Sequence, residues 1–238
     1  MVQAYRRYAF HLIYQKVHNF CSVDLGSFYL DVLKDRMYTT PAEGRARRSA
    51  QTAMYHIAES MVRWLAPILS FTAEEIWQHL PGERAESVFL ATWHGLPQAS
   101  AAEIDWQALL MLRTDVTREL EKLRDAGAIG APLDAEVDIY CAPAQYGRFS
   151  VLGEELRFFF ITSHARVHRL GGAAPADAVP AVNLAREGVW VAVKPTQDPK
   201  CVRCWQRRAD VGANAVHPEL CGRCVANVEG PGEERHFV

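Results

Sequence analysis

The sequence lacks a long uninterrupted hydrophobic run. Its longest apolar stretch, from Ile57 to Phe71, contains Glu59 and Arg63 and is shorter than the about 20 apolar residues that a membrane-spanning helix needs. The first residues, MVQAYRRYAFHLIYQKV, carry scattered cations and offer neither an apolar signal core nor a cleavage site. We therefore expect no membrane partner and no secretory signal.

The chain also has little net charge. Its 26 Lys and Arg residues nearly balance its 28 Asp and Glu residues, which leaves a formal charge of −2. No strong overall positive field attracts nucleic acid, so any such contact must come from local basic patches. With 49% hydrophobic and 23% charged residues, the composition is that of a globular protein and excludes a wholly disordered chain.

Motifs for nucleotide binding and catalysis are missing as well. The sequence has neither a GxxxxGK[ST] loop nor a GxGxxG turn between a strand and a helix. His164 and His168 have the spacing of a zinc-protease pair, but the glutamate of that motif is absent between them. No Ser, Asp and His are arranged recognisably for acyl transfer, and we predict no catalytic residue in this chain.

Only six cysteines are present, too few for a disulfide scaffold, but four of them cluster near the C-terminus. Cys201 and Cys204 form one Cys-x2-Cys pair, and after sixteen intervening residues Cys221 and Cys224 form a second. Two such knuckles can wrap four thiolates around one zinc in a closed tetrahedron, without a position for a catalytic water. A redox role fits poorly, because it needs one accessible dithiol beside a βα unit. We predict one structural zinc and, since the thiols must stay reduced, a cytoplasmic protein.

The surroundings of the cysteine cluster are basic. They include Lys200, Arg203, Arg207, Arg208 and Arg223, with Trp205 directly after the first knuckle. These residues fit a surface that stacks on bases and contacts phosphates. They fit equally well a solvated rim that offsets the negative charge of four thiolates, with Trp205 as the small core of the module. His217 is a rival zinc ligand, which we place in the loop instead.

Apolar periodicity predicts a mainly helical chain. Helices are expected over Val2–Phe20, Asp24–Arg36, Ala46–Ile68, Thr72–Pro81 and Glu103–Ala126. Thr72 and Glu75 fit a capping box at the start of the fourth helix. Strict alternation predicts strands over Leu133–Cys141 and Gly188–Lys194.

These elements group into three predicted domains. Residues 1–94 form a helical bundle, residues 95–198 a small α+β module, and residues 199–238 a four-cysteine zinc ribbon. Because the first helix begins almost at residue 1 without a cap residue before it, we expect the bundle to be truncated at its N-terminus.

The bundle and the tail both resemble one family. The segments FCSVDLGSFYLDVLKDRMYT (Phe20–Thr39) and ARRSAQTAMYHIAESMVRWLAPILSFTAEEIWQHLPGE (Ala46–Glu83) are similar to the anticodon-binding helical domain of bacterial isoleucyl-tRNA synthetases. The tail KCVRCWQRRADVGANAVHPELCGRCVANVEGPGEERHFV resembles the C-terminal zinc module of the same enzymes. The helical part alone is shared in outline with the synthetases for valine, leucine and methionine. The terminal four-cysteine module is the feature that distinguishes the isoleucine enzyme from these.

The resemblance implies a C-terminal fragment of an isoleucine–tRNA ligase. The HIGH and KMSKS signatures of the family's catalytic domain are absent, and so is its editing domain. The chain alone is therefore expected not to bind ATP or activate isoleucine, which would require the missing N-terminal catalytic region. The resemblance implies that this part of the enzyme binds the anticodon stem-loop of isoleucine tRNA. We also expect the protein to be a monomer.

Anticodon loops present unstacked bases, which proteins read by aromatic stacking and edge hydrogen bonds while Arg and Lys hold phosphates. Cations at the start of a helix oppose its dipole, a mild misfit that favours an external anion as their partner, although a solvated helix end also explains them. We expect Phe28, Trp64 and Trp77 to pack in the core. The candidate tRNA contacts are Arg36, Arg45, Arg47, Arg48, Arg203, Trp205, Arg207, Arg208 and Arg223.

Two other functions remain open at this point. Formamidopyrimidine-DNA glycosylases end in a similar four-cysteine finger, so the chain could be a DNA-binding or repair protein. Those enzymes need an N-terminal catalytic proline, and the start Met-Val-Gln-Ala does not provide it. A third possibility is a protein-interaction module in which zinc only stabilises the fold.

Overall fold

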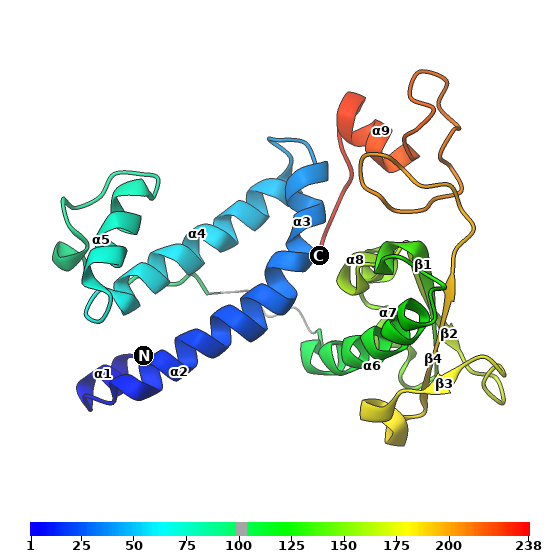
Figure 1. The fold of residues 1–238 in the computed structure, drawn as a ribbon, viewed down its shortest axis with the longest axis horizontal. Helices are drawn as coiled ribbons and strands as arrows, with labels where there is room; N and C mark the ends of the chain where they lie inside the picture. Colours follow the sequence, from blue (N-terminus) through cyan, green and yellow to red (C-terminus); the bar gives the residue numbers. More distant parts are fainter. Residues whose placement is uncertain (99–103) are drawn as a thin grey trace. The chain divides into compact units, whose positions relative to one another are not determined.

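A computed structural model of the protein describes residues 1–98 and 104–238. The chain divides into two compact units, the first comprising Met1–Asp31 and Arg47–Ser100, the second Val32–Ala46 and Ala101–Val238. The predicted fold class is confirmed: the chain is mainly helical, with a small four-stranded sheet and a four-cysteine cluster (Figure 1). Within the described residues, no helix combines the length and the apolar character needed to cross a membrane.

Every secondary-structure element that the structure describes in the first unit is helical. Its elements are α1 (Val2–Arg6), α2 (Phe10–Asn19), the π-helix η1 (Phe20–Tyr29), most of α4 (Arg45–Leu65), α5 (Ser70–His79) and the 3₁₀ turn η2 (Val88–Leu90). The predicted single helix over Val2–Phe20 is wrong, because Tyr8 adopts a left-handed conformation with φ of 54° and separates α1 from α2. The predicted interruption after Phe20 is wrong too, since α2, η1 and α3 (Leu30–Thr39) follow one another directly.

The start of α5 also differs from the prediction. The helix begins at Ser70, and Leu69 at the N-cap position provides no side-chain hydrogen bond. The capping box of Thr72 and Glu75 is therefore wrong, because both residues lie inside the helix. Glu74 instead accepts hydrogen bonds from the Ser87 hydroxyl (2.8 Å) and the Val88 N–H (3.0 Å), which ties η2 to α5.

Trp77 anchors the core of the first unit, as predicted. Its side chain is 2% exposed, and its indole N–H donates to the carbonyl of Ala85 (2.8 Å). The guanidinium groups of Arg63 and Arg84 each lie 4.6 Å from the Trp77 ring, and both pair with the buried carboxylate of Glu59. Cation–π attraction and ion pairing thus hold α4 and the residues after α5 around one aromatic ring.

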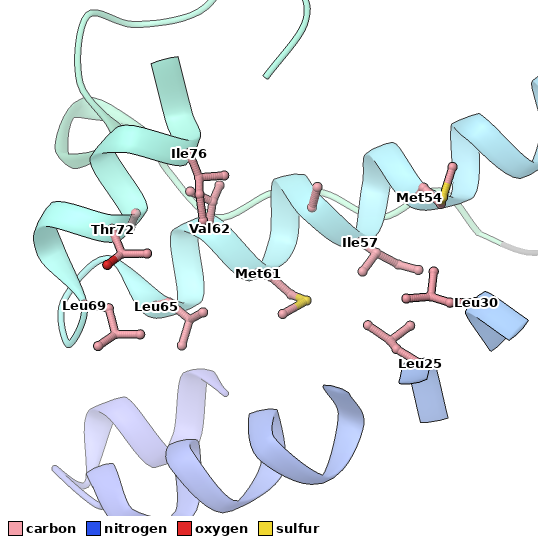
Figure 2. A pocket seen from close by; sticks show the side chains of 12 residues that line it. Leu25, Leu30, Met54, Ile57, Met61, Val62, Leu65, Leu69, Thr72 and Ile76 are labelled. Carbon is pink, nitrogen blue, oxygen red and sulfur yellow. The ribbon is translucent and has the colours of Figure 1, made fainter. Parts of the chain in front are cut away.

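An apolar cavity of about 320 Å³ opens in the first unit (Figure 2). Leucine, isoleucine, valine, alanine and methionine side chains from η1, α3, α4 and α5 line it, and Thr72 contributes a hydroxyl group. Apart from the Thr72 hydroxyl, this lining offers no side chain that could act as an acid or a base.

The second unit contains the sheet, with strand order β2-β1-β4-β3. The strands are β1 (Ala135–Cys141), β2 (His164–Arg169), β3 (Val179–Pro180) and β4 (Val189–Pro195). β1 pairs in parallel with β2 and antiparallel with β4, which also pairs antiparallel with β3. β1 and β4 confirm the two predicted strands. β2 was not predicted because it contains only two apolar residues, Ala165 and Val167, so its alternation with His164, Arg166 and His168 is short and weakly hydrophobic.

Helices cover one face of this sheet. α6 (Trp106–Asp125) packs on β4, while α7 (Tyr146–Ser150) and α8 (Leu156–Phe160) pack on β2 (Figure 1). The side chains between them are fully buried, as Leu112 of α6 and Ile139 of β1 illustrate. The predicted start of α6 at Glu103 lies outside the described residues. The remaining elements after α6 are η3 (Pro132–Asp134), η4 (Gly153–Glu155), η5 (Val182–Glu187) and the C-terminal α9 (Gly222–Glu229).

Candidate metal centre and nucleic-acid interface

Four cysteine side chains converge in the second unit. The Sγ atoms of Cys201, Cys204, Cys221 and Cys224 lie within 4.8 Å of one another, and all four residues are buried. The Sγ atoms of Cys204 and Cys221 are 3.8 Å apart, as expected for two corners of a tetrahedron with zinc–sulfur bonds of about 2.3 Å. No other cluster of three or more potential metal ligands occurs among the described residues. The donor set and its spacing fit a single structural zinc.

Three of the four thiols influence one another's pKa values. Hydrogen bonds from Cys221 and Cys224 hold the pKa of the Cys204 thiol far below its usual value. The contact with Cys204 in turn raises the pKa values of Cys221 and Cys224. Since zinc binds thiolates, metal binding must displace the protons that these two thiols otherwise keep.

Local hydrogen bonds shape each knuckle. The Trp205 N–H donates to the carbonyl of Cys201 (2.9 Å), and Trp205 takes a left-handed φ of 64° that closes the first turn. At the second knuckle, the Gly222 N–H donates to Asp210 Oδ2 (2.9 Å). A Cβ atom at Gly222 would lie 2.8 Å from that carboxylate oxygen, so a glycine is needed for Asp210 to approach.

Two candidate tRNA contacts, Arg203 and Arg223, have partners inside the second unit. Arg203 Nη1 donates to the carbonyl of Thr39 (2.6 Å) in the last turn of α3. Arg223 Nη1 and Nη2 donate to the two carboxylate oxygens of Asp35 (2.7 and 2.8 Å). Burial raises the pKa of the Asp35 carboxyl, but the hydrogen bonds and charges of Arg223 and Arg235 outweigh it and hold that pKa below its usual value.

Arg207 and Arg208 bind the end of the sheet where β1 and β2 begin. Arg207 Nε lies 2.8 Å from Asp134 Oδ1, and its backbone N–H donates to the Ser163 hydroxyl (2.6 Å). Arg208 Nη1 donates to the Ser163 carbonyl (3.1 Å) and lies 3.2 Å from His164 Nδ1. Both side chains therefore already hold intramolecular partners that a phosphate would have to share or displace.

Trp205 is the candidate with the most open surroundings in the cysteine module. Its side chain is 62% exposed, so it is not the buried core of the module. The Lys200 ammonium lies 6.0 Å from its ring, at the outer limit of a cation–π contact. An exposed ring beside a cation is the combination that binds a stacked base next to a phosphate.

The helical candidates differ in their exposure. Arg36 is buried at 8% exposure, and Arg47 is half-buried. Arg45 and Arg48 are exposed, and Arg48 donates to the side chain of Gln51 (3.2 Å). Arg203, Trp205, Arg207, Arg208 and Arg223 thus belong to the segments that carry the four cysteines, whereas Arg45, Arg47 and Arg48 lie in the first turn of α4.

The two histidines that were set aside from the sequence have carboxylate partners. His164 Nε2 lies 2.9 Å from Asp198 Oδ2, and His168 Nε2 lies 2.7 Å from Asp138 Oδ1. Both histidines lie in β2 rather than in a helix, and each binds a different carboxylate.

Sequence reasoning missed the residues that hold the C-terminal segment. The carboxylate of Glu155 accepts three backbone N–H groups, those of His236, Phe237 and Val238, at 2.6–2.9 Å. The Arg235 guanidinium lies 3.3 Å from the Phe158 ring. No local pattern could have identified these partners, because Glu155 and His236 are 81 positions apart in the sequence.

Comparisons with known proteins match both parts of the chain. A family model for the anticodon-binding domain of tRNA ligase matches residues 1–139, and a model for a zinc finger found in FPG and IleRS matches residues 198–227. Isoleucine–tRNA ligases are similar over nearly the whole chain. That of Thioalkalivibrio sulfidiphilus is 60% identical over 242 residues, and that of Nitrosococcus oceani 56% over 245 residues, covering 99% and 100% of this chain. The chain spans about a quarter of the length of these relatives, 25% in each case.

Proposed function

Because the chain belongs to the family of anticodon-binding domains of tRNA ligases, we propose that it is the tRNA-anticodon-recognising C-terminal part of an isoleucine–tRNA ligase. The observation that carries this proposal is the succession, in one chain, of the anticodon-binding domain and the four-cysteine finger. Activation of isoleucine with ATP belongs, in this proposal, to the remaining three quarters of the full-length enzyme.

The zinc is held by Cys201, Cys204, Cys221 and Cys224 in this proposal. Four buried sulfurs within 4.8 Å support this ligand set. With every coordination position filled by sulfur, the zinc has a structural role, and its binding supplies much of the folding free energy of the small module.

The RNA surface of the module is centred on Trp205. Its exposed indole stacks on an unpaired loop base, and Lys200 beside it neutralises a neighbouring phosphate. Arg45 and Arg48 contribute further phosphate contacts, which their exposure at the start of α4 supports. Arg36, Arg47, Arg207 and Arg208 stay weaker candidates, because they are buried, half-buried or already paired.

Isoleucine tRNA as the specific partner, a monomeric state and a cytoplasmic location are further parts of the proposal. The names of the relatives support the first. Six free thiols, four of them gathered as metal ligands, support a reducing compartment.

A DNA-binding function is the alternative, because the matched finger is described as occurring in FPG as well as in IleRS. Binding of the zinc-loaded chain to isoleucine tRNA, to the same tRNA with a changed anticodon loop and to duplex DNA, each at two salt concentrations, distinguishes the two. We expect the unchanged tRNA to bind most tightly. Equal binding to duplex DNA would contradict anticodon recognition, and binding to neither nucleic acid would favour a protein-interaction module.

A further inference from the structure

The two knuckles of the cysteine module share a feature that metal binding does not explain. Each has an arginine immediately before its second cysteine, in the sequences Cys-Val-Arg-Cys and Cys-Gly-Arg-Cys. Both of these arginines, Arg203 and Arg223, reach the same turn of α3, which is distant in sequence. The residue before the second cysteine therefore binds the same turn of α3 in both knuckles.

The chemistry of the α3 turn explains why arginines bind there. The last carbonyls of a helix have no partner within the helix, and the helix dipole makes this end attractive to cations. Arg203 binds the Thr39 carbonyl, and Arg223 binds the Thr39 hydroxyl (3.3 Å) as well as both oxygens of Asp35. The Arg223 side chain is only 11% exposed, and Asp35 raises its pKa above the usual arginine value against the opposing effect of burial.

A third arginine closes the arrangement from the C-terminal segment. Arg235, whose side chain is 1% exposed, pairs with Asp35 and lies over the ring of Phe158. Glu233 binds both Arg223 (2.9 Å) and Arg235 (3.3 Å). Asp35 is therefore the common acceptor of two arginines that approach from different segments.

We propose that Arg203, Arg223 and Asp35 are positioning residues that lock the zinc finger onto the last turn of α3, so that zinc binding fixes the place of the RNA-contacting side chains of the finger. This inference rests on the proposed tRNA-binding function and deepens it. The metal holds the two knuckles at a fixed separation, and only then can both arginines bind one helical turn. Arg203 and Arg223 do not hold phosphates.

Replacement of Asp35 tests this proposal, because a purely electrostatic effect and a loss of positioning would change the affinity for tRNA in opposite directions. Asp35→Asn removes a negative charge, which by direct electrostatics would tighten the binding of an anionic RNA. Loss of the lock instead weakens tRNA binding, roughly 2- to 30-fold for a residue that acts through others. Glu219→Gln removes the same charge from an exposed position of the zinc finger and serves as the matched control, with unchanged or slightly tighter binding expected. An Asp35→Asn variant that binds tRNA as tightly as the parent would overturn the proposal.

The salt dependence of binding gives a second readout. If Arg223 held a phosphate, Arg223→Met would lower the slope of log K against log salt by about 0.7–0.9. For a positioning residue the affinity falls while the slope stays that of the parent. A slope reduced by that amount would show that Arg223 is a direct contact.

Amide hydrogen exchange tests the lock without any RNA. In the zinc-loaded parent, the amides of residues 36–40 should exchange more slowly than after zinc chelation. Asp35→Asn should accelerate the same amides while one equivalent of zinc is retained, and Asp35→Glu, which keeps the carboxylate, should restore most of the protection. If chelation of the parent leaves these amides unchanged, the lock does not exist, even if the Asn variant fails to fold. If the parent shows zinc-dependent protection but no tRNA binding, the proposed function fails and the lock stands.

Discussion

Single charged residues in this chain act mostly through partners from other elements. Glu59 of α4 is 3% exposed and pairs with Arg63 of the same helix and with Arg84 after α5. Both guanidinium groups lie 4.6 Å from the centre of the Trp77 ring. Burial raises the pKa of the Glu59 carboxyl, but hydrogen bonds from Arg63 and Arg84 outweigh it and hold the pKa below the ordinary value of 4.5. A carboxylate in this position stabilises the fold only while it is ionised.

Glu59→Gln should lower the free energy of unfolding by about 2 kcal/mol at pH 7, because charged hydrogen bonds to two arginines are lost. A carboxyl with a lowered folded-state pKa contributes stability above its ordinary pKa and loses it as the pH falls through the folded-state value. The difference between parent and variant should therefore shrink below about pH 4.5. Urea unfolding at pH 7 and pH 4 measures it, and an equal difference at both pH values would contradict the ion-pair explanation.

Trp205→Ala should weaken tRNA binding by about 1–3 kcal/mol, the range for stacking of a base on an aromatic side chain. Because the ring is 62% exposed, its removal should leave the zinc in place. Fluorescence anisotropy with labelled isoleucine tRNA measures the effect, and zinc content verifies the fold. Phe237→Ala is a suitable control, since it removes another partly exposed ring (39%) of the second unit. Unchanged affinity in a zinc-replete Trp205→Ala variant would mean that the module only stabilises the fold.

At the scale of elements, α9 depends on the metal. It has eight residues, fewer than the about 12–15 that an isolated helix needs to be even marginally stable in water. Cys221 at its N-cap and Cys224 in its first turn attach it to the other knuckle. The finger should therefore fold and unfold with its zinc.

The purified chain should contain about one zinc per molecule, because four thiolates complete one tetrahedral site. Cys201→Ser combined with Cys224→Ser should abolish zinc binding and the protection of the α9 amides from exchange. Cys21→Ser, outside the cluster, is the matched control and should keep the metal. Elemental analysis decides the question: zinc that persists in the double variant would exclude this ligand set.

At the scale of the whole molecule, the chain aligns over nearly its full length with a quarter of each isoleucine–tRNA ligase. The described residues contain an apolar cavity and a closed metal site, but these provide no group for nucleotide chemistry. Recognition and chemistry are therefore assigned to different parts of the proposed enzyme.

The 238-residue chain alone should show no isoleucine-dependent exchange of pyrophosphate into ATP, because we assign that reaction to the rest of the enzyme. The full-length isoleucine–tRNA ligase of Nitrosococcus oceani provides the positive control. If the purified chain still catalyses this exchange after contaminating synthetase has been removed, the assignment of isoleucine activation to the rest of the enzyme is wrong.

The sequence by itself determined the features that depend on near neighbours. The cysteine spacing predicted the metal centre, because each knuckle is a local turn whose ligands are three positions apart. Alternation predicted β1 and β4, and helical periodicity predicted most of α4 and α6, since these patterns reflect which side of one element is buried. The left-handed conformation of Tyr8 left no comparable signal in the sequence, and the alternation in β2 involves only two apolar residues, Ala165 and Val167, which is too short to identify a strand.

Only the tertiary structure decided which of the predicted basic residues are available to RNA. The eight arginines among the nine candidates look alike in the sequence, yet Arg45 and Arg48 are exposed while Arg223 pairs with Asp35, 188 positions away. Such pairings arise when folding brings distant charges together in surroundings of low polarity, where an unpaired arginine or aspartate would be strongly unfavourable. Composition and spacing record which charges a chain carries, whereas burial and partner choice are properties of the folded chain alone.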